Sequence, residues 1–277
     1  MNHLMRSIHS RHGQAFTCLV LVCCALGALD AAANRILPGD KISEQQLQEA
    51  YAKHFAKIQQ VLPPHSALPP LLDLTKPRTE EDDRDRVWEK PYTLSASPGG
   101  IDDPGVPRLS EATSTGTTFF DHVGRPAALP AKSCEAVIIG EPIRAEARIS
   151  SNRELVYSRF LVKVVNVWKC KKKSGIHNGA DLIAVQLGGS VRFPSGHLTT
   201  FVVASSGFVG VGKQYILFLW RPPRSSQTYM VAEPYLVEGG LVFPVRTEAD
   251  VSAYEGMPLD KFEARVKAAI AAEVDAN

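Results

Sequence analysis

Between residues 132 and 247 the sequence changes pattern every few residues, and this stretch constrains the fold more than any other. Short runs rich in β-branched and aromatic residues alternate with polar residues and are separated by turns that contain Gly or Pro. Several short strands with such spacing, and no helical period between them, predict a mainly β fold that forms an antiparallel barrel or sandwich. Strands are expected at 135–149, 155–168, 181–187, 191–193, 198–204, 214–220, 229–232 and 241–245.

Two irregularities are expected in the first two strands. Pro142 has no amide hydrogen to donate, so it predicts an edge position or a bulge. Val164 and Val167 are spaced by three positions instead of two, which predicts a second bulge.

The first 33 residues have the pattern of a secretory signal peptide. A polar start with Arg6 and Arg11 precedes an uncharged apolar run over 15–29, which is too short to span about 30 Å of hydrocarbon. Ala31-Ala32-Ala33 then offers a small-residue cleavage site. We expect cleavage between Ala28 and Asn34, export to the periplasm or the cell exterior, and no stable transmembrane segment afterwards. An uncleaved membrane anchor is the alternative.

Export leaves two of the five cysteines, Cys134 and Cys170, and a lone pair in an oxidising compartment predicts a disulfide. If residues 151–153 form a hairpin tip, Ser150 is opposite Glu154, and the residue numbers of every opposed pair add up to the same value. Cys134 and Cys170 have that sum too, so they would be opposite each other, provided that the two bulges compensate. In the loop-closure model such a bridge would contribute roughly 3–4 kcal/mol.

Two helices flank the β region. An amphipathic helix is expected over 41–62, ending at Pro63-Pro64, with His54 beside its apolar stripe as a solvated or boundary residue rather than a metal ligand. A C-terminal helix is expected over 257–273, with Pro258 in its first turn, and should pack on the barrel or cover its end.

Residues 63–130 differ in kind, because they hold 11 of the 19 prolines and show no hydrophobic period. They predict a Pro-rich flexible linker that cannot bury enough apolar surface to offset its ordering entropy. The charged run over 80–86 lies inside it and contains no Gly for the sharp turn of a calcium loop, so we interpret it as a solvated charge run.

Composition and motifs give little sign of catalysis. The formal net charge of +2 over 277 residues provides little attraction to nucleic acid. The chain has no H-E-x-x-H, G-x-S-x-G, P-loop or G-x-G-x-x-G motif, and Ser205-Ser206-Gly207 lacks the leading Gly of a nucleophile elbow. His177 and His197 lie beside Gly-containing turns and are interpreted as loop histidines. No catalytic residue, metal ligand or cofactor is therefore expected.

One local charge cluster stands out. Lysines flank Cys170, next to Trp168, and form a possible anion-binding patch for polysaccharide, lipid headgroups or nucleic acid, with a solvated hairpin end as the alternative. The patch consists of Lys169, Lys171, Lys172 and Lys173.

Several framework segments carry a resemblance to a group of exported bacterial proteins with a small OB-like β-barrel. They are the strand start 134–141, the strand 157–169, the Gly188-Gly189 step and the stretch 211–219. At greater distance the arrangement is similar to the barrels of netrin modules and of tissue inhibitors of metalloproteinases. Those inhibitors present an N-terminal cysteine to the protease zinc, whereas Cys134 has no free amine, so their mechanism does not transfer.

These observations predict an exported, non-enzymatic OB-like barrel over 131–247 with a binding or interaction role. Its partner would be a protein or polysaccharide in the envelope or outside the cell, rather than nucleic acid. Two alternatives remain open: a hydrolase whose site is assembled from scattered residues, and a protein or protease inhibitor that presents an exposed loop such as 221–227.

Overall fold

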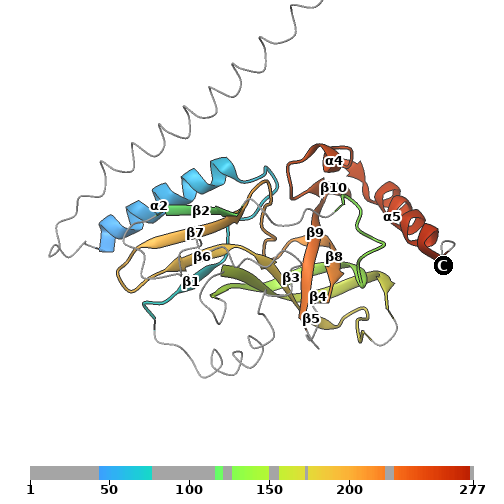
Figure 1. The fold of residues 1–277 in the computed structure, drawn as a ribbon, viewed down its shortest axis with the longest axis horizontal. Coiled ribbons are helices and arrows are strands. Elements are labelled where there is room, and N and C mark those ends of the chain that lie inside the picture. The colour runs from blue at the N-terminus through green and yellow to red at the C-terminus, as the bar shows by residue number, and fades with distance from the viewer. Residues whose placement is uncertain are drawn as a thin grey trace, which may run out of the picture. The chain divides into compact units, whose positions relative to one another are not determined.

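The computed structural model describes residues 44–76, 116–120, 127–149, 156–171, 174–221 and 228–274. Within these residues strands outweigh helices, which confirms the predicted mainly β class (Figure 1). The helices are α2 (Glu44–Val61), α4 (Ala249–Ser252) and α5 (Leu259–Val274). The strands are β1 (Leu71–Asp73), β2 (Gly116–Phe120), β3 (Ala136–Ile149), β4 (Val156–Cys170), β5 (Asp181–Leu187), β6 (Gly189–Arg192), β7 (Leu198–Val203), β8 (Gln214–Trp220), β9 (Thr228–Glu238), β10 (Leu241–Pro244) and β11 (Met257–Pro258).

Five strands of the larger sheet pair in a circuit. The order is β3–β4–β5–β9–β8, and β8 pairs in turn with β3. Every pair is antiparallel except β5–β9. Strands β10 and β11 extend the sheet beyond β9.

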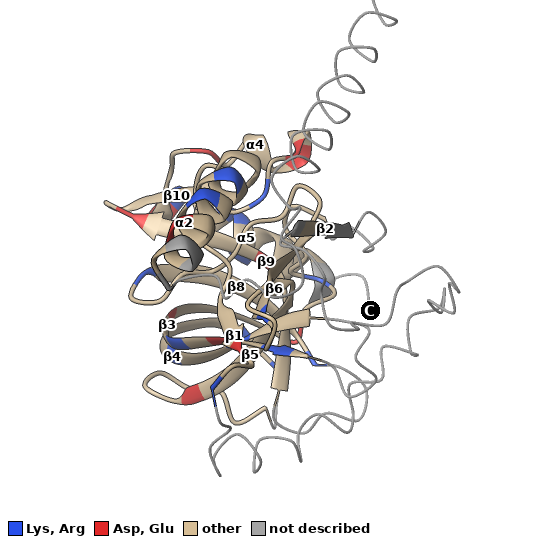
Figure 2. Ribbon diagram, turned by 90° about the vertical axis from the view of Figure 1, so that its left-hand side faces the viewer, with Lys and Arg blue, Asp and Glu red and all other residues tan. Residues whose placement is uncertain are grey.

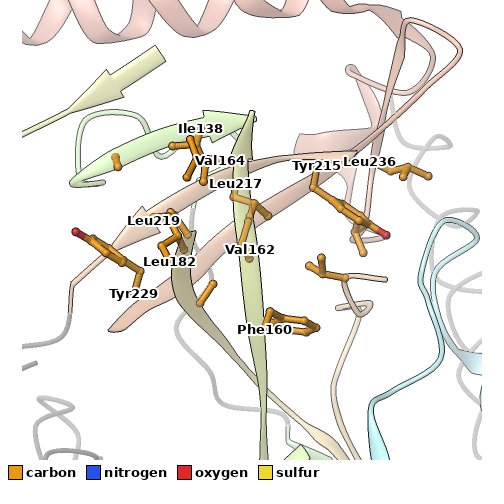
Figure 3. Packing of buried hydrophobic residues seen from close by; sticks show 14 residues of the cluster. Ile138, Phe160, Val162, Val164, Leu182, Tyr215, Leu217, Leu219, Tyr229 and Leu236 are labelled. Atoms are coloured by element: carbon orange, nitrogen blue, oxygen red, sulfur yellow. The ribbon is translucent and has the colours of Figure 1, made fainter. Parts of the chain in front are cut away.

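Alternate side chains of the circuit strands form the largest buried cluster (Figure 3). On β4 the residues at 160, 162 and 164 belong to it, and their neighbours at 159, 161 and 163 lie on the other face. This period of two is the sequence pattern that predicts the strands. The labelled members of the cluster are Ile138, Phe160, Val162, Val164, Leu182, Tyr215, Leu217, Leu219, Tyr229 and Leu236.

Both predicted bulges are present between β3 and β4. The register shifts at Ile143, next to Pro142, and again at Val165. A third shift, which was not predicted, occurs at Trp168. Two extra residues on β4 therefore face one extra residue on β3, so the bulges do not compensate.

A second sheet has the strand order β1–β6–β7–β2, and its two central strands lie between β5 and β8 in chain order. Its two central strands form an antiparallel hairpin, and each edge strand is parallel to its neighbour. One face packs on the β3–β4 hairpin through Val191, Phe193 and Phe201. Both edge strands come from the region that was predicted to be a flexible linker.

The linker prediction is therefore wrong for part of its range. Residues 71–73 and 116–120 form strands, and Ala67 bridges to Phe208. These short segments acquire strand structure by pairing with a hairpin that is distant in sequence. The charged run over 80–86 lies outside the described residues.

Helix α2 covers the other face of the second sheet, and Ile58 and Leu62 pack against Val202 and Phe208. His54 is 8% exposed, and its Nε2 lies 2.9 Å from Thr200 Oγ1, which lies 2.8 Å from Ser190 Oγ. The expectation of a solvated or boundary histidine is thus wrong, because β7 presents a hydroxyl group directly opposite this side chain.

Gly188 lets the chain pass from β5 into β6 without a loop. Its φ of +96° is in the region that favours glycine, and an added Cβ would lie 2.7 Å from the carbonyl oxygen of Phe201. The Ser158 hydroxyl donates to the Gly188 carbonyl at 2.8 Å. This corner joins the two sheets.

Helix α5 packs on the outer side of β8 and β9, where Phe262 lies 4.7 Å from Tyr235 between ring centroids. The predicted helix over 257–273 is confirmed except at its start. Pro258 lies in β11 and pairs with Leu241 instead of opening the helix.

Candidate binding face

The outer surface of β3, β4, β5 and β9 carries the most distinctive arrangement of side chains in the described chain. We call it the outer face. Most of its residues alternate along each strand with residues of the buried clusters, and Arg148, Tyr157, Val185 and Thr228 are themselves buried. Its members are Arg144, Glu146, Arg148, Tyr157, Arg159, Leu161, Lys163, Asp181, Ile183, Val185, Leu187, Thr228 and Met230.

Three guanidinium groups surround one carboxylate on this face. Arg148 Nη2 lies 2.8 Å and Arg159 Nη1 lies 3.1 Å from Glu146 Oε1. Arg144 Nη2 lies 3.6 Å from Glu146 Oε2, and its side chain is 56% exposed. We call this group the Arg cluster; Glu146 is a carboxylate partner that its three arginines share, and each arginine makes further interactions.

The ladder fixes the positions of these charges. Glu146 is opposite Arg159 on β4, and Arg148 is opposite Tyr157. Arg148 donates to Glu146 Oε1 through both Nε and Nη2, and its side chain is 10% exposed. Paired strands hold these groups more rigidly than a loop would. Figure 2 marks the basic and acidic positions of the described chain, including those on β3 and β4.

Apolar side chains continue the same rows toward β5 and β9. Leu161 is opposite Ile183, and Ile183 is opposite Thr228. Val185 lies between Arg159 and Met230 in the neighbouring row. Leu161, Ile183 and Met230 are half-buried. The outer face therefore combines cationic groups with partly accessible apolar surface.

The cluster was not predicted, although the sequence contains a signal for it. Arg144, Glu146 and Arg148 alternate with Ala145 and Ala147, so all three charges share one face of a strand. The pairing with Arg159 depends on the register, which the sequence did not settle.

The lysine patch predicted beside Cys170 is only partly described. Lys169 Nζ donates to the Ala131 carbonyl at 2.6 Å, so this ammonium is directed at the protein's own backbone. Lys171 is exposed, and Lys172 and Lys173 lie outside the described residues. The neighbouring Trp168 packs against the cluster beneath α5.

The expected Cys134–Cys170 disulfide is absent, and both residues are free thiols. Cys170 lies opposite Ala136, two positions from Cys134. The observed register therefore differs from the predicted one by two residues. One residue of this difference arises at the hairpin end, where Ile149 pairs with Val156, and the other arises at the bulge on β4 that has no counterpart on β3.

The two thiols lie in different surroundings. Cys134 is 1% exposed, and burial raises the pKa of its thiol to about 12, with Lys169 opposing the shift. Cys170 is half-buried, and its Sγ forms a hydrogen bond with the Ser174 hydroxyl.

The hydroxyl and imidazole groups considered in the sequence analysis are not joined into a site. Ser205 lies in a turn at φ +63°, and Ser206 bridges to Arg246. His177 contacts the Asn178 carbonyl, and His197 accepts a backbone hydrogen bond from Phe193.

Neither a cluster of metal ligands nor a helix able to cross a membrane occurs among the described residues. No group of three or more His, Cys, Asp and Glu side chains in them is placed to hold a metal ion. No helix in the same part of the chain combines the length and apolar character needed to cross a bilayer.

Comparison with models of known protein families found no match for this chain, and comparison with curated proteins found none either.

Proposed function

We propose that this chain is an exported, non-catalytic binding module and that its outer face binds an anionic partner, a protein or polysaccharide of the cell envelope or exterior. The Arg cluster carries the proposal. It places three guanidinium groups around one carboxylate on a paired, preorganised sheet. Charged groups and half-buried apolar side chains on one rigid surface are typical of a recognition face.

We further propose that the five-strand circuit is an OB-like barrel. Its strand order, with β5–β9 as the one parallel pair of the circuit, supports this interpretation. So does the resemblance of segments such as 134–141 and 211–219 to exported OB-like proteins. OB-fold proteins bind oligonucleotides and oligosaccharides on the face of their second and third strands. The second and third strands of this circuit are β4 and β5, which carry Arg159, Leu161 and Ile183.

Export is the third element of the proposal. It is supported by the basic start, the apolar run over 15–29 and the Ala31-Ala32-Ala33 site. The intact mass of the protein isolated from the envelope should correspond to a chain that begins near Asn34, or near Ala28 if the alternative site is used. Recovery of the full-length chain from the inner membrane would contradict export.

Retention on an immobilised sulfated polysaccharide, used as a polyanionic probe, tests the binding face. R144Q/R159Q should elute at lower salt than the unaltered chain, because two cations have left the outer face. K261Q/K267Q is the matched control, since both lysines are exposed on α5 and the net charge changes equally. Equal elution of the two variants would contradict the assignment of binding to the outer face.

A further inference from the structure

The segment over 248–255 lies between β10 and β11 and contains the four-residue helix α4; we call it the clasp. On either side of it, Thr247 and Gly256 each donate a backbone hydrogen bond of 3.0 Å to another part of the fold. Within it, Val251 is 1% exposed and packs in the cluster beneath α5. Helix α4 has no side-chain cap at its N-terminus, and a single helical turn has little stability of its own. The clasp therefore depends on its contacts with the rest of the fold.

One guanidinium group connects the clasp to a carboxyl group on β9. Arg246 Nη1 lies 3.2 Å from Glu248 Oε2, and Arg246 Nη2 lies 2.9 Å from Asp250 Oδ2. Arg246 Nε lies 3.2 Å from Glu233 Oε2. Two acids of the clasp thus share a cation with an acid of the larger sheet.

The surroundings of Glu233 favour its neutral form. Its side chain is 1% exposed, and its Oε1 accepts no hydrogen bond from the described residues. Such burial costs more free energy for an ionised carboxylate than for a protonated one. Burial raises the pKa of Glu233 to about 8; Arg246 opposes this shift, and Asp250 and Glu248 reinforce it.

Two phenol groups lie next to these charges. Tyr235 follows Glu233 by two positions on β9, and its ring centroid lies 5.9 Å from that of Tyr254 in the clasp. Burial raises the pKa of Tyr235 well above its ordinary range, so this phenol stays neutral where Glu233 titrates. Phe218, which is opposite Glu233 on β8, is apolar.

We propose that the clasp is closed while Glu233 carries a proton and opens when this carboxyl group ionises. The new negative charge repels the carboxylates of Glu248 and Asp250 and competes with them for Arg246. Arg246 and Glu248 make further interactions, which do not remove this repulsion. Asp250 is 46% exposed and can turn toward water, so its side of the clasp is released first.

Opening releases a proton and uncovers apolar surface. In the closed form the pKa of Glu233 is about 8, and in the open form water reaches the carboxyl group, so its pKa returns toward 4.5. The equilibrium constant for opening should therefore increase by up to about tenfold for each pH unit between about pH 5.5 and 7.5, and level off above about pH 8. Opening withdraws Val251 from the cluster that includes Tyr235, which makes this part of β9 accessible.

Hydrogen exchange of the full chain tests the proposal, when the rates in peptides that cover 248–255 are divided by the intrinsic rate at each pH. The amides of Val251, Ser252 and Tyr254 are hydrogen-bonded within the clasp, so their exchange reports its opening. The unaltered chain should show the pH dependence given above, and E233Q should show a flat profile. A flat profile in the unaltered chain, or an equal slope in E233Q, would overturn the proposal.

Opening of the clasp must be distinguished from unfolding of the whole chain, which the same carboxyl group also affects. Peptides over 160–164 serve as the reference, because this part of β4 belongs to the largest buried cluster. The clasp should exchange at least about tenfold faster than this reference at pH 8. Equal exchange in the two regions would mean that the clasp does not open by itself, and would overturn the proposal.

Two further variants keep the test decisive if E233Q is destabilised. D250N removes an exposed acid that contributes to the raised pKa of Glu233, so opening should level off at a lower pH than in the unaltered chain. E255Q is the matched control, since Glu255 belongs to the clasp but contacts His65, at 2.8 Å, and it should leave the slope unchanged. An unchanged profile in D250N, or loss of the slope in E255Q, would assign the pH dependence to other groups and overturn the proposal.

Discussion

At the scale of single residues, the most unusual group is the buried carboxyl of Glu233. It is 1% exposed, and one of its oxygens lies 3.2 Å from Arg246 Nε. Arg246 also contacts Glu248 at 3.2 Å and Asp250 at 2.9 Å, so a single guanidinium faces three acids. Burial raises the pKa of Glu233 to about 8; Arg246 opposes this shift, and the two other acids reinforce it.

This carboxyl should make stability decrease as the pH rises. In the folded protein Glu233 holds its proton up to about pH 8, whereas in the unfolded chain it loses it near pH 4.5. Folding therefore takes up a proton in this window, and the free energy of unfolding should decrease across it by an amount on the order of a few kcal/mol. Urea unfolding across the window should show a shallower decrease in E233Q. An identical slope in both proteins would contradict the assignment.

The two thiols should differ in reactivity. Cys134 is buried with a raised thiol pKa, so it presents little thiolate to a reagent. Cys170 should be labelled in the native, unreduced protein, and Cys134 should be labelled only after unfolding. Mass spectrometry of labelled peptides checks this. If Cys170 is not labelled and a disulfide-linked peptide is found, the claim that the strand register keeps the two thiols apart is wrong.

At the scale of elements, the sequence predicted those strands whose period is visible locally. The 181–187 and 214–220 strands occur at the expected residues, because alternation and flanking turns define them without reference to any partner. Strands β1 and β2 have three and five residues and occur in a proline-rich stretch without a period. Their structure depends on parallel pairing with β6 and β7, which no local pattern reveals.

The proposed binding face was less predictable than the strands. Outward-pointing Arg144, Glu146 and Arg148 can be recognised on one strand, but their alignment with Arg159 requires the register. That register results from three bulges and the position of the hairpin tip. The Pro142 and Val164–Val167 irregularities were predicted, whereas the one at Trp168 had no sequence signal. This unmatched bulge also accounts for part of the error in the disulfide prediction.

The Gly188 corner can be tested with a matched glycine. Gly188 and Gly212 both have positive φ, at +96° and +75°, but an added Cβ meets the Phe201 carbonyl only at Gly188. G212A should lower the free energy of unfolding by about 1 kcal/mol through backbone strain alone. G188A should cost clearly more, because the backbone of β7 must also move. Denaturant titration of both variants checks this, and equal effects would contradict the role of the corner.

At the scale of the whole molecule, the two sheets share one folded unit. The hairpin β6–β7 of the second sheet is inserted between β5 and β8 in chain order, and the N-terminal strands β1 and β2 complete that sheet. Its faces are covered by the β3–β4 hairpin and by α2. The Arg cluster lies on that hairpin, so the sheet that supports the hairpin end also stabilises the proposed binding face.

Truncation should therefore expose core surface. A fragment of residues 127–277 lacks α2, β1 and β2, which leaves Val202 and Phe208 without the packing of Ile58 and Leu62. Compared with residues 48–277, it should bind a hydrophobic dye more strongly and unfold at lower denaturant. Denaturant titration and dye fluorescence of the two fragments give the comparison. Equal stability would mean that the second sheet does not depend on the N-terminal segments.

The central claim is that the outer face is where this protein binds an anionic partner. Hydrogen–deuterium exchange of the full chain, with and without the sulfated polysaccharide probe, tests it most directly. The account predicts added protection in peptides that cover 144–149, 156–163 and 181–187, and its loss in R144Q/R159Q. Protection confined to the lysine-rich segment 169–173, or no change in any strand of the outer face, would contradict it.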